Sequence, residues 1–227
     1  MNASTASIGR SCVFSKWFKK NDAEETIRSP EIIGLRLGGA FELDALRLKL
    51  IEPLVIFEGA AKTQFIQAVG EVKLDDNSTL LRFYTDDDSF VQVLLNGGMT
   101  ENHIEDVKLW YFYDTKAVGS QADWDRLINT DISRPEYTLE GHRFLRVWES
   151  VGSSSPPVAM TETTYTETDG TSETDQFVML YERPVDDMLD EFALVSGEEK
   201  IINGRADRCL VIATGINLQS ADITIIG

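Results

Sequence analysis

Residues 106–113, DVKLWYFY, carry large side chains on both sides of an alternating pattern. One set is Val107, Leu109, Tyr111 and Tyr113, and the other is Lys108, Trp110 and Phe112. Successive side chains of a strand point to opposite faces of its sheet, so an apolar set on each side indicates that both faces are covered. The stretch therefore predicts a central strand with packed side chains on both sides.

Further runs on either side of this stretch also predict strands. They are 54–57, 65–74, 80–84 and 90–95 before it, and 143–148, 191–196, 208–214 and 223–226 after it. Residues 75–78 (DDNS) and 96–98 (NGG) have the composition of tight turns. Both 65–113 and 158–214 contain a turn-linked hairpin followed by further strands. Their residue identities match poorly, so an internal repeat stays an open question.

The threonine-rich segment 161–174 favours a solvent-exposed hairpin over disorder. Threonine suits strands, and Asp169-Gly170 stands where a two-residue turn would close the hairpin. We expect Thr161–Thr168 to pair with Ser172–Leu180.

Two short helices are predicted, each with a side chain that can cap it. Asp44 can cap a helix over 45–51, on which Leu46 and Leu50, with Leu54 beyond, share an apolar face before Pro53 ends the helix. Ser120 and Asp123 form a capping-box pattern at the start of a helix over 121–128. The buried side of this second helix is expected to consist of Trp124, Leu127 and Ile128.

These elements predict an α+β, mostly β fold: an antiparallel strand-rich domain with two short helices and a flexible N-terminal tail. Residues 1–30 form the tail and 31–227 a single globular domain. Residues 152–157, GSSSPP, are the best candidate for an internal break.

Composition excludes several classes of protein. The 227 residues carry a net charge of -17 with a pI near 4.4, and such a field repels nucleic-acid phosphates. Cys12 and Cys209 have no metal-ligand or redox spacing and are expected to be reduced thiols. No secretory signal and no apolar run of membrane-spanning length stand in the sequence. We therefore expect a cytoplasmic protein that does not bind nucleic acid.

The acidic charge is densest between residues 158 and 199. Twelve carboxylates lie there, and Arg183 is the one opposing cation. This stretch is either a solubilising face or a binding surface for a cation such as a polyamine or a basic protein segment.

The tail carries a basic and aromatic stripe. Val13, Phe14, Trp17 and Phe18 fall on one side of a helix, with Lys16, Lys19 and Lys20 in other directions. The stripe predicts weak contact with an anionic membrane surface or a partner protein. The alternative is that the basic tail folds back onto the acidic body or stays disordered.

Few residues suggest catalysis. Asp86, Asp87 and Asp88 offer oxygen ligands for a hard cation. The alternative is a solvent-exposed turn that binds no metal ion. His103 and His142 belong to no zinc motif, Cys12 has no partner base, and no phosphate-binding loop, dinucleotide fingerprint or serine elbow is present. The sequence predicts no cofactor.

Five segments together resemble the YjfK-like family of uncharacterised bacterial proteins, from about residue 32 to the end. They are IGLRLGGA (33–40), RFYTDDD (82–88), EDVKLW (105–110), RVW (146–148) and MLYER (179–183). The resemblance implies a bacterial cytosolic protein, encoded beside phage-shock-protein-A-like membrane-stress proteins, with no assigned activity and no catalytic residues. Within RFYTDDD, we expect Arg82 and the aspartates to form an ion-pair network that pins the strands.

We accordingly expect a non-catalytic interaction or accessory protein with a link to envelope stress. It would be recruited to a partner, such as a phage-shock-protein-A-like protein, or to the periphery of the inner membrane. Two alternatives stay open: a metal-dependent hydrolase that uses Asp86–Asp88, and a cation- or polyamine-binding module that uses the acidic face 158–199.

Overall fold

The computed structural model describes residues 28–148, 154–168 and 170–227. Its strands are β1 Ala40–Leu43, β2 Thr63–Lys73, β3 Ser78–Thr85, β4 Ser89–Asn96, β5 Ile104–Ala117, β6 Glu136–Leu139, β7 His142–Arg146, β8 Val158–Thr166, β9 Gly170–Pro184, β10 Asp190–Ile202, β11 Arg205–Asn217 and β12 Ile223–Ile225. The helices are α1 Ala45–Ile51 and α2 Gln121–Arg126, and a π-helical turn Leu127–Asp131 extends α2. Short 3-10 turns cover Glu52–Leu54, Glu101–His103 and Ser220–Asp222. The expected mostly β fold with two short helices is confirmed, whereas residues 1–27 lie outside the description.

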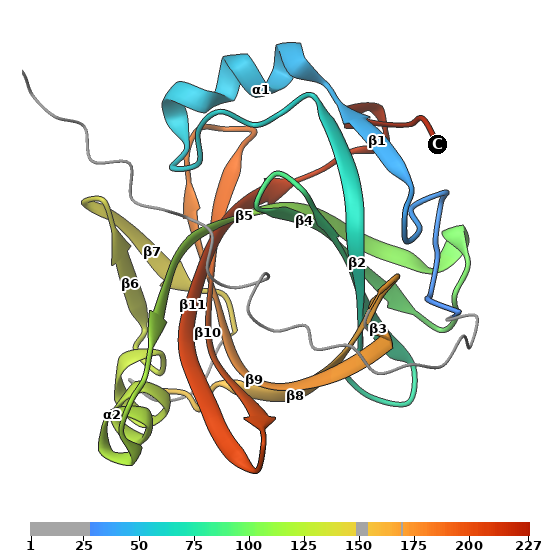
Figure 1. Cartoon of the computed structure of the whole chain (residues 1–227). Helices are drawn as coiled ribbons and strands as arrows, with labels where there is room; N and C mark the ends of the chain where they lie inside the picture. The colour runs from blue at the N-terminus through green and yellow to red at the C-terminus, as the bar shows by residue number, and fades with distance from the viewer. Residues whose placement is uncertain (1–27, 149–153, 169) are drawn as a thin grey trace, which may run out of the picture.

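Eight of the described strands close into an antiparallel barrel. Their order is β2-β3-β4-β5-β11-β10-β9-β8, and β8 returns to pair with β2 (Figure 1). Closure satisfies the backbone hydrogen-bonding groups that an open sheet would expose at its edges. Strands on both sides of residues 152–157 therefore share one sheet.

The barrel consists of two four-stranded meanders. β2–β5 form one and β8–β11 the other, and they join where β5 pairs with β11 and where β2 pairs with β8. The first strand of one meander pairs with the first strand of the other, and the last strand pairs with the last, so the two halves have the same strand arrangement. This topological likeness exists although the residue identities of the halves match poorly.

Apolar cores cover the outer face of the barrel wall on two sides. The first lies between β2–β5 and the N-terminal segment with β1 and α1, and includes Leu35, Phe41, Phe83 and Leu109. The second lies between β9–β11 and the layer of α2, β6 and β7. Gly197 permits α2 and its π-helical extension to approach, because a Cβ there would lie 3.1 Å from the Trp124 ring and 2.5 Å from Cδ1 of Ile128.

A third apolar cluster, the inner core, fills part of the barrel interior. It contains Ala68, Tyr84, Phe90, Trp110, Phe192 and Ala213. The strand at 106–113 contributes side chains to two cores, since Leu109 and Tyr111 belong to the first outer core and Trp110 belongs to the inner core. The prediction that this strand is covered on both faces is therefore confirmed.

Both predicted helices form, but the expected buried face of α1 is wrong. Asp44 caps α1 by accepting from the N–H groups of Leu46 and Arg47. The buried side chain is Leu48, whereas Leu46 and Leu50 are 69% and 67% exposed. A helix of seven residues presents only about two turns to the body, so the side that is buried depends on how it lies on the barrel.

The second helix follows its sequence pattern. Ser120 accepts from the Asp123 N–H at its start, and Trp124 and Leu127 are buried. None of the helices in the described ranges is long and apolar enough to cross a membrane.

The threonine-rich hairpin forms, with a different register and environment from those expected. Thr166 pairs with Gly170, so Gly170 belongs to the second arm and the predicted two-residue turn at Asp169-Gly170 is wrong. The expected solvent exposure applies to one face of the hairpin only, because β8 pairs with β2 and closes the barrel, whereas outward-facing side chains such as Thr161, Glu173 and Asp175 are exposed. Every second side chain of its arms faces inward, and Glu162, Thr166, Thr174 and Gln176 are buried.

Candidate functional site inside the barrel

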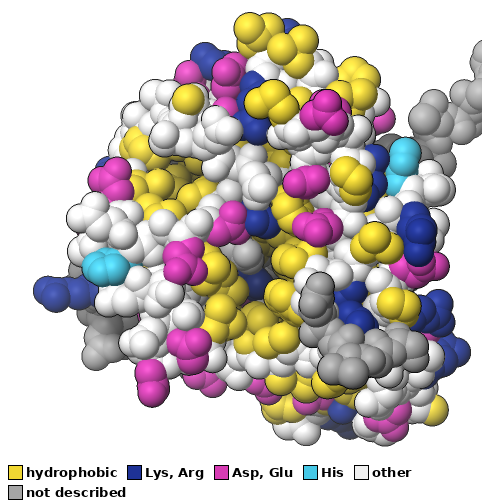
Figure 2. Space-filling model, turned by 180° about the vertical axis from the view of Figure 1, so that it is seen from behind, with side chains coloured by type: hydrophobic (Ala, Val, Ile, Leu, Met, Phe, Trp, Pro, Cys, Tyr) yellow, Lys and Arg dark blue, Asp and Glu magenta, His cyan; other side chains and the backbone are white. Residues whose placement is uncertain are grey.

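The barrel interior holds a small cavity with apolar walls and a group of converging polar side chains. Its volume is about 70 Å³. Its lining residues are Arg82, Tyr84, Phe90, Phe112, Glu162, Thr164, Ser172, Thr174, Gln176, Val178, Leu194, Ser196, Glu198, Lys200, Val211 and Ala213. Seen from behind, the molecule is hollowed near the middle of that face, and hydrophobic side chains surround the hollow (Figure 2).

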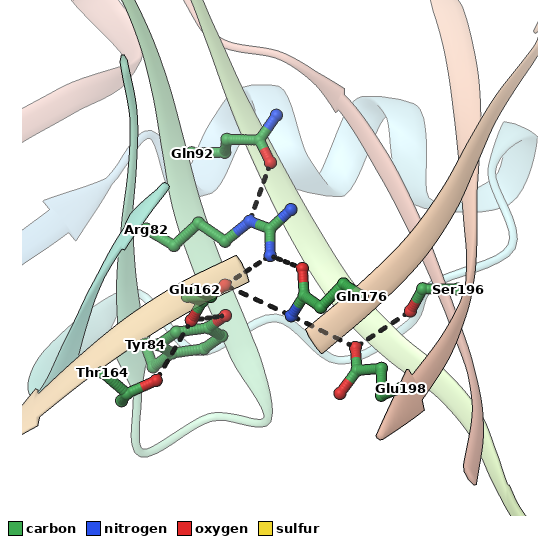
Figure 3. Close-up of polar contacts among 8 residues, drawn as sticks. All are labelled: Arg82, Tyr84, Gln92, Glu162, Thr164, Gln176, Ser196 and Glu198. Carbon is green, nitrogen blue, oxygen red and sulfur yellow. Dashed lines mark hydrogen bonds and ion pairs between the residues drawn. The ribbon is translucent and has the colours of Figure 1, made fainter. Parts of the chain in front are cut away.

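An ion pair between Arg82 of β3 and Glu162 of β8 stands at the centre of the polar group (Figure 3). Nη1 of Arg82 lies 2.5 Å from Oε2 of Glu162, and the side chains are 4% and 3% exposed. Arg82 also donates from Nη1 to Gln176 at 2.8 Å and from Nε to Gln92 at 3.0 Å. The pair thus connects strands from both halves of the barrel.

The other oxygen of Glu162 is held by hydroxyl donors. Oε1 accepts from the Tyr84 hydroxyl at 2.8 Å and from Thr164 at 3.3 Å. Gly70 of β2 leaves the space that this carboxylate occupies, since a Cβ at that position would lie 2.3 Å from Oε1. A glycine within a strand often marks such a close approach.

The electrostatics of the ion pair favour a charged guanidinium and a neutral phenol. Burial lowers the pKa of Arg82, but the interactions with Glu162, Tyr84 and Glu198 together outweigh burial, and the pKa is raised. Burial, followed by the charge of Glu162, raises the pKa of Tyr84 well above its usual value. Tyr84 therefore remains a hydrogen-bond donor at all physiological pH values.

A second carboxylate, that of Glu198 on β10, lies close to the pair (Figure 3). Its Oε1 accepts from Ser196 at 2.9 Å and from the Gln176 amide at 3.5 Å. Among the described residues, no donor contacts Oε2. Burial, and next the charge of Glu162, raises the pKa of Glu198 to about 7. The cavity thus contains a carboxylate that changes charge near neutral pH.

The deeper part of the barrel is filled by aromatic rings. Phe90, which lines the cavity, stacks on Trp110 with ring centroids 6.1 Å apart, and Phe192 meets Trp110 edge-on. Trp110 is fully buried, and its Nε1–H has no acceptor among the described residues. The arrangement suits a ligand with an apolar body and a polar head.

The three candidate metal-binding aspartates lie at the β3–β4 turn, away from the ion pair. Asp86 is exposed and accepts from the Phe65 N–H at 2.9 Å. Oδ2 of Asp87 accepts from the N–H of Ala61, the amide of Gln64 and the hydroxyl of Tyr111. Asp88 is exposed and has φ +49°. The three carboxylates thus contact different groups, and Asp87 stabilises the local fold through its three hydrogen bonds.

The expected network of Arg82 with these aspartates is wrong. Arg82 points into the barrel because it alternates with the outward-facing Leu81 and Phe83, and its ion-pair partner is Glu162. Among the described residues, no group of three or more His, Cys, Asp or Glu is placed to hold a metal ion. Metal binding by Asp86–Asp88 stays a prediction, which calorimetry with Mg²⁺, Mn²⁺ and Ca²⁺ would test.

The remaining candidate residues lie apart from the cavity or outside the description. His103 contacts Thr100 next to a turn, and His142 is exposed on β7. Burial raises the pKa of the Cys209 thiol to about 12, which leaves it protonated. Cys12 and the stripe with its lysines, Val13, Phe14, Lys16, Trp17, Phe18, Lys19 and Lys20, lie outside the described residues.

The acidic stretch 158–199 does not form one face. Glu162 and Glu191 are buried and Glu198 lines the cavity, whereas others such as Glu173 and Asp175 are exposed. Alternation along β8, β9 and β10 separates these carboxylates onto opposite sides of the wall. Part of this charge thus lies inside the barrel, where sequence reasoning did not place it.

Sequence reasoning missed Glu162, Gln176 and Glu198 as members of one site. A signal was present in Arg82, a charged residue within the apolar run 80–84, and in Gly70 within the strand 65–74. A buried charge requires an opposite charge, so Arg82 implied an acidic partner. Nothing local identified Glu162 as that partner, because it lies 80 residues away.

Comparisons with known proteins agree with the resemblance inferred from the motifs. A family model described as "Protein of unknown function (DUF2491)" matches residues 13–224. The "Uncharacterized protein YjfK" of Escherichia coli (strain K12) is 26% identical over 217 residues, which cover 94% of this chain and 98% of that protein. The predicted likeness to YjfK-like proteins is therefore confirmed. No solved structure matches the chain.

Proposed function

The chain belongs to the DUF2491 family of proteins of unknown function. Membership of this family therefore suggests no activity. We propose that the chain is a non-catalytic binding protein whose barrel holds a small ligand. The observation that carries this proposal is the cavity inside the closed barrel, with apolar walls and a few converging polar groups. Sites for small molecules have this composition, and the interiors of β-barrels are among their usual places.

The alternation of the wall strands supports a binding role for the interior. Barrel strands that served packing alone would be expected to fill the lumen with apolar side chains, as the outer cores are filled. Here Arg82, Glu162, Gln176 and Glu198 occupy inward positions at the cavity. Buried polar groups carry a desolvation cost, and orientation of a ligand is a function that offsets it.

The test measures whether a small probe stabilises the full-length protein from inside the barrel. The probes are n-hexylamine, n-hexanol and n-hexanoate, which share an apolar chain and differ in head group. We expect at least one to raise the Tm of the wild type, because a ligand that binds only the folded state stabilises it. If none of the three raises the Tm, the proposed function is wrong.

A pair of matched variants locates the binding. Ala213→Leu enlarges a buried side chain that lines the cavity, whereas Ala206→Leu makes the same change at an exposed position of the same strand. We expect Ala213→Leu to abolish the probe's effect and Ala206→Leu to leave it unchanged. An unchanged effect in Ala213→Leu would place the probe outside the barrel.

A second candidate function is that of an accessory protein in envelope stress, located in the cytoplasm and recruited to a partner or to the inner-membrane surface. The exposed apolar side chains of α1, Leu46 and Leu50, favour a protein contact. The partner proposed is a phage-shock-protein-A-like protein. This role is compatible with ligand binding in the barrel.

Direct binding between purified proteins tests the accessory role. We expect the wild type to bind the phage-shock-protein-A-like protein and the double variant Leu46→Glu/Leu50→Glu to bind at least tenfold more weakly. Both leucines are exposed, so the variant should retain the Tm of the wild type. Equal binding by both proteins would exclude α1 as the contact surface.

A further inference from the structure

We propose that the ligand of the barrel is a small organic cation, with an ammonium head on an apolar body, whose head lies against the carboxylate of Glu198. This inference rests on the proposed function, because it names the class of ligand that the cavity takes. It differs from a surface site for polyamines, since the carboxylates concerned lie inside the barrel.

The first argument is charge balance at the cavity. Arg82 and Glu162 neutralise each other at 2.5 Å. Glu198 forms no ion pair within 4 Å in the part of the chain that the structure describes, although Ser196 and Gln176 donate to one of its oxygens. Its Oε2 remains open to a further donor, and a cation is the partner that stabilises the ionised form of a partly buried carboxylate.

The second argument is the nature of the walls. Phe90, Phe112 and Tyr84 contribute aromatic rings to the lining, and Val178, Leu194 and Val211 contribute aliphatic surface. A ring face attracts a cation, as the guanidinium of Arg82 already shows at 5.7 Å from the Phe90 centroid. The same rings bury the apolar body of a ligand. A carboxylate beside aromatic rings therefore favours an organic ammonium over a bare metal ion.

The third argument concerns anions, which the site disfavours. The guanidinium of Arg82 already donates to Glu162, Gln176 and Gln92. An anionic head would lie near two carboxylates in a chain of net charge -17. Lys200 also lines the cavity, but burial lowers its pKa, which weakens it as an anchor for an anion.

Binding of a cation should displace a proton from Glu198. The charged and titratable groups that face this carboxylate are Glu162, Arg82, Tyr84 and Cys209, with Lys200 on its own strand. Burial, and next the charge of Glu162, outweighs the hydrogen bond from Ser196 and the charge of Arg82 and raises the pKa of Glu198 to about 7. An ammonium head favours the ionised form, so its affinity should rise with pH through this value and level off above it.

Calorimetry on the full-length protein with n-hexylamine, n-hexanol and n-hexanoate tests the inference. We expect hexylammonium to bind more tightly than the two other probes at pH 8. Between pH 8 and pH 6 its affinity should fall roughly tenfold, because the ionised fraction of a group with a pKa near 7 changes by that factor. At pH 6 the binding heat should depend on the ionisation enthalpy of the buffer, since a proton is released.

Isosteric variants separate the role of Glu198 from general electrostatics. Glu198→Gln should weaken hexylammonium at least tenfold at pH 8 and remove the pH dependence. Glu198→Asp should keep the pH dependence. Glu173→Gln removes the same charge from an exposed position on the neighbouring strand β9 and should change neither quantity. Melting curves verify that each variant is folded.

Two results would overturn the inference and leave lumen binding intact. One is tighter binding of hexanol or hexanoate than of hexylammonium. The other is hexylammonium binding that Glu198→Gln does not change. Failure of the proposed function gives a different pattern, in which no probe stabilises the protein or Ala213→Leu leaves the stabilisation unchanged.

Discussion

Two buried arginine–glutamate pairs stand on opposite faces of the barrel wall. Outside the wall, Nη2 of Arg183 lies 2.6 Å from Oε2 of Glu191. Arg183 also donates to the Leu54 carbonyl at 2.8 Å, and Glu191 accepts from the Ile56 N–H at 2.6 Å. This outer pair therefore fixes the backbone at residues 54–56 against β9 and β10.

The inner pair, Arg82–Glu162, has side chains rather than backbone as its further partners. Gln92, Gln176, Tyr84 and Thr164 surround it, and the cavity lies beside them. Backbone partners cannot move without a change in fold, whereas side chains can adopt other rotamers. The outer pair, with its backbone partners, therefore stabilises the fold, whereas the inner pair, with its side-chain partners, can rearrange around a ligand.

The largest expected loss of stability follows from removal of the arginine of the outer pair. Arg183→Met leaves Glu191, which is fully buried, without its counter-ion. The free energy of unfolding should fall by about 3–5 kcal/mol, the usual cost of an uncompensated buried charge. Denaturant unfolding at pH 7 measures it. A loss below about 1 kcal/mol would show that this pair does not hold the segment.

Replacement of the arginine of the inner pair by methionine should lower the free energy of unfolding by less. Arg82→Met leaves Glu162 with the hydroxyls of Tyr84 and Thr164 and the amide of Gln176 as donors. We expect a loss of about 2–3 kcal/mol, because hydrogen bonds remain to the carboxylate. The same unfolding experiment compares the two variants. A larger loss for Arg82→Met than for Arg183→Met would break the proposed distinction between the pairs.

The third effect is a pH dependence that originates at Glu198. Its pKa is raised from 4.5 to about 7, so the folded state binds more protons than the unfolded state between these values. Stability should therefore fall as pH rises through this window. The expected fall is about 2 kcal/mol, less than the full shift implies because the carboxylate is only partly buried.

Glu198→Gln isolates this contribution. The difference in unfolding free energy between variant and wild type should increase from pH 4.5 to pH 7 and then stay constant, with the pH limits set by the pKa values above. Chemical unfolding at a series of pH values gives this difference. A difference that does not vary with pH would mean that Glu198 titrates as an exposed glutamate does.

The smallest effects on stability separate Asp87 from Asp88 at the β3–β4 turn. Asp87→Asn should cost about 1–2 kcal/mol, since it weakens the acceptor of three donors, one of them the Tyr111 hydroxyl. Asp88→Asn should change stability by less than about 0.5 kcal/mol, because asparagine tolerates a positive φ. Thermal melts of the two variants give the comparison, and equal losses would contradict the assigned role of Asp87.

The sequence by itself determined most of the strands, the two helix caps and the turns at 75–78 and 96–98, whereas the strand predicted at 54–57 is absent, because a 3-10 turn covers Glu52–Leu54 and β2 begins only at Thr63. The alternation at 106–113 predicted a strand covered on both faces, and Asp44 and Ser120 predicted the helix starts. These features depend on side-chain periodicity and on hydrogen bonds between residues two or three positions apart, so the chain carries them locally.

Tertiary structure decided which face of each element is buried and which distant residues meet. The register of β8 against β9 depends on which side chains enter the barrel, because a shift of one residue would reverse every side chain. The Leu48 side of α1 is buried only because the helix lies on the first outer core. Arg82 and Glu162 form a pair only because β8 closes on β2, a contact between segments that no local pattern connects.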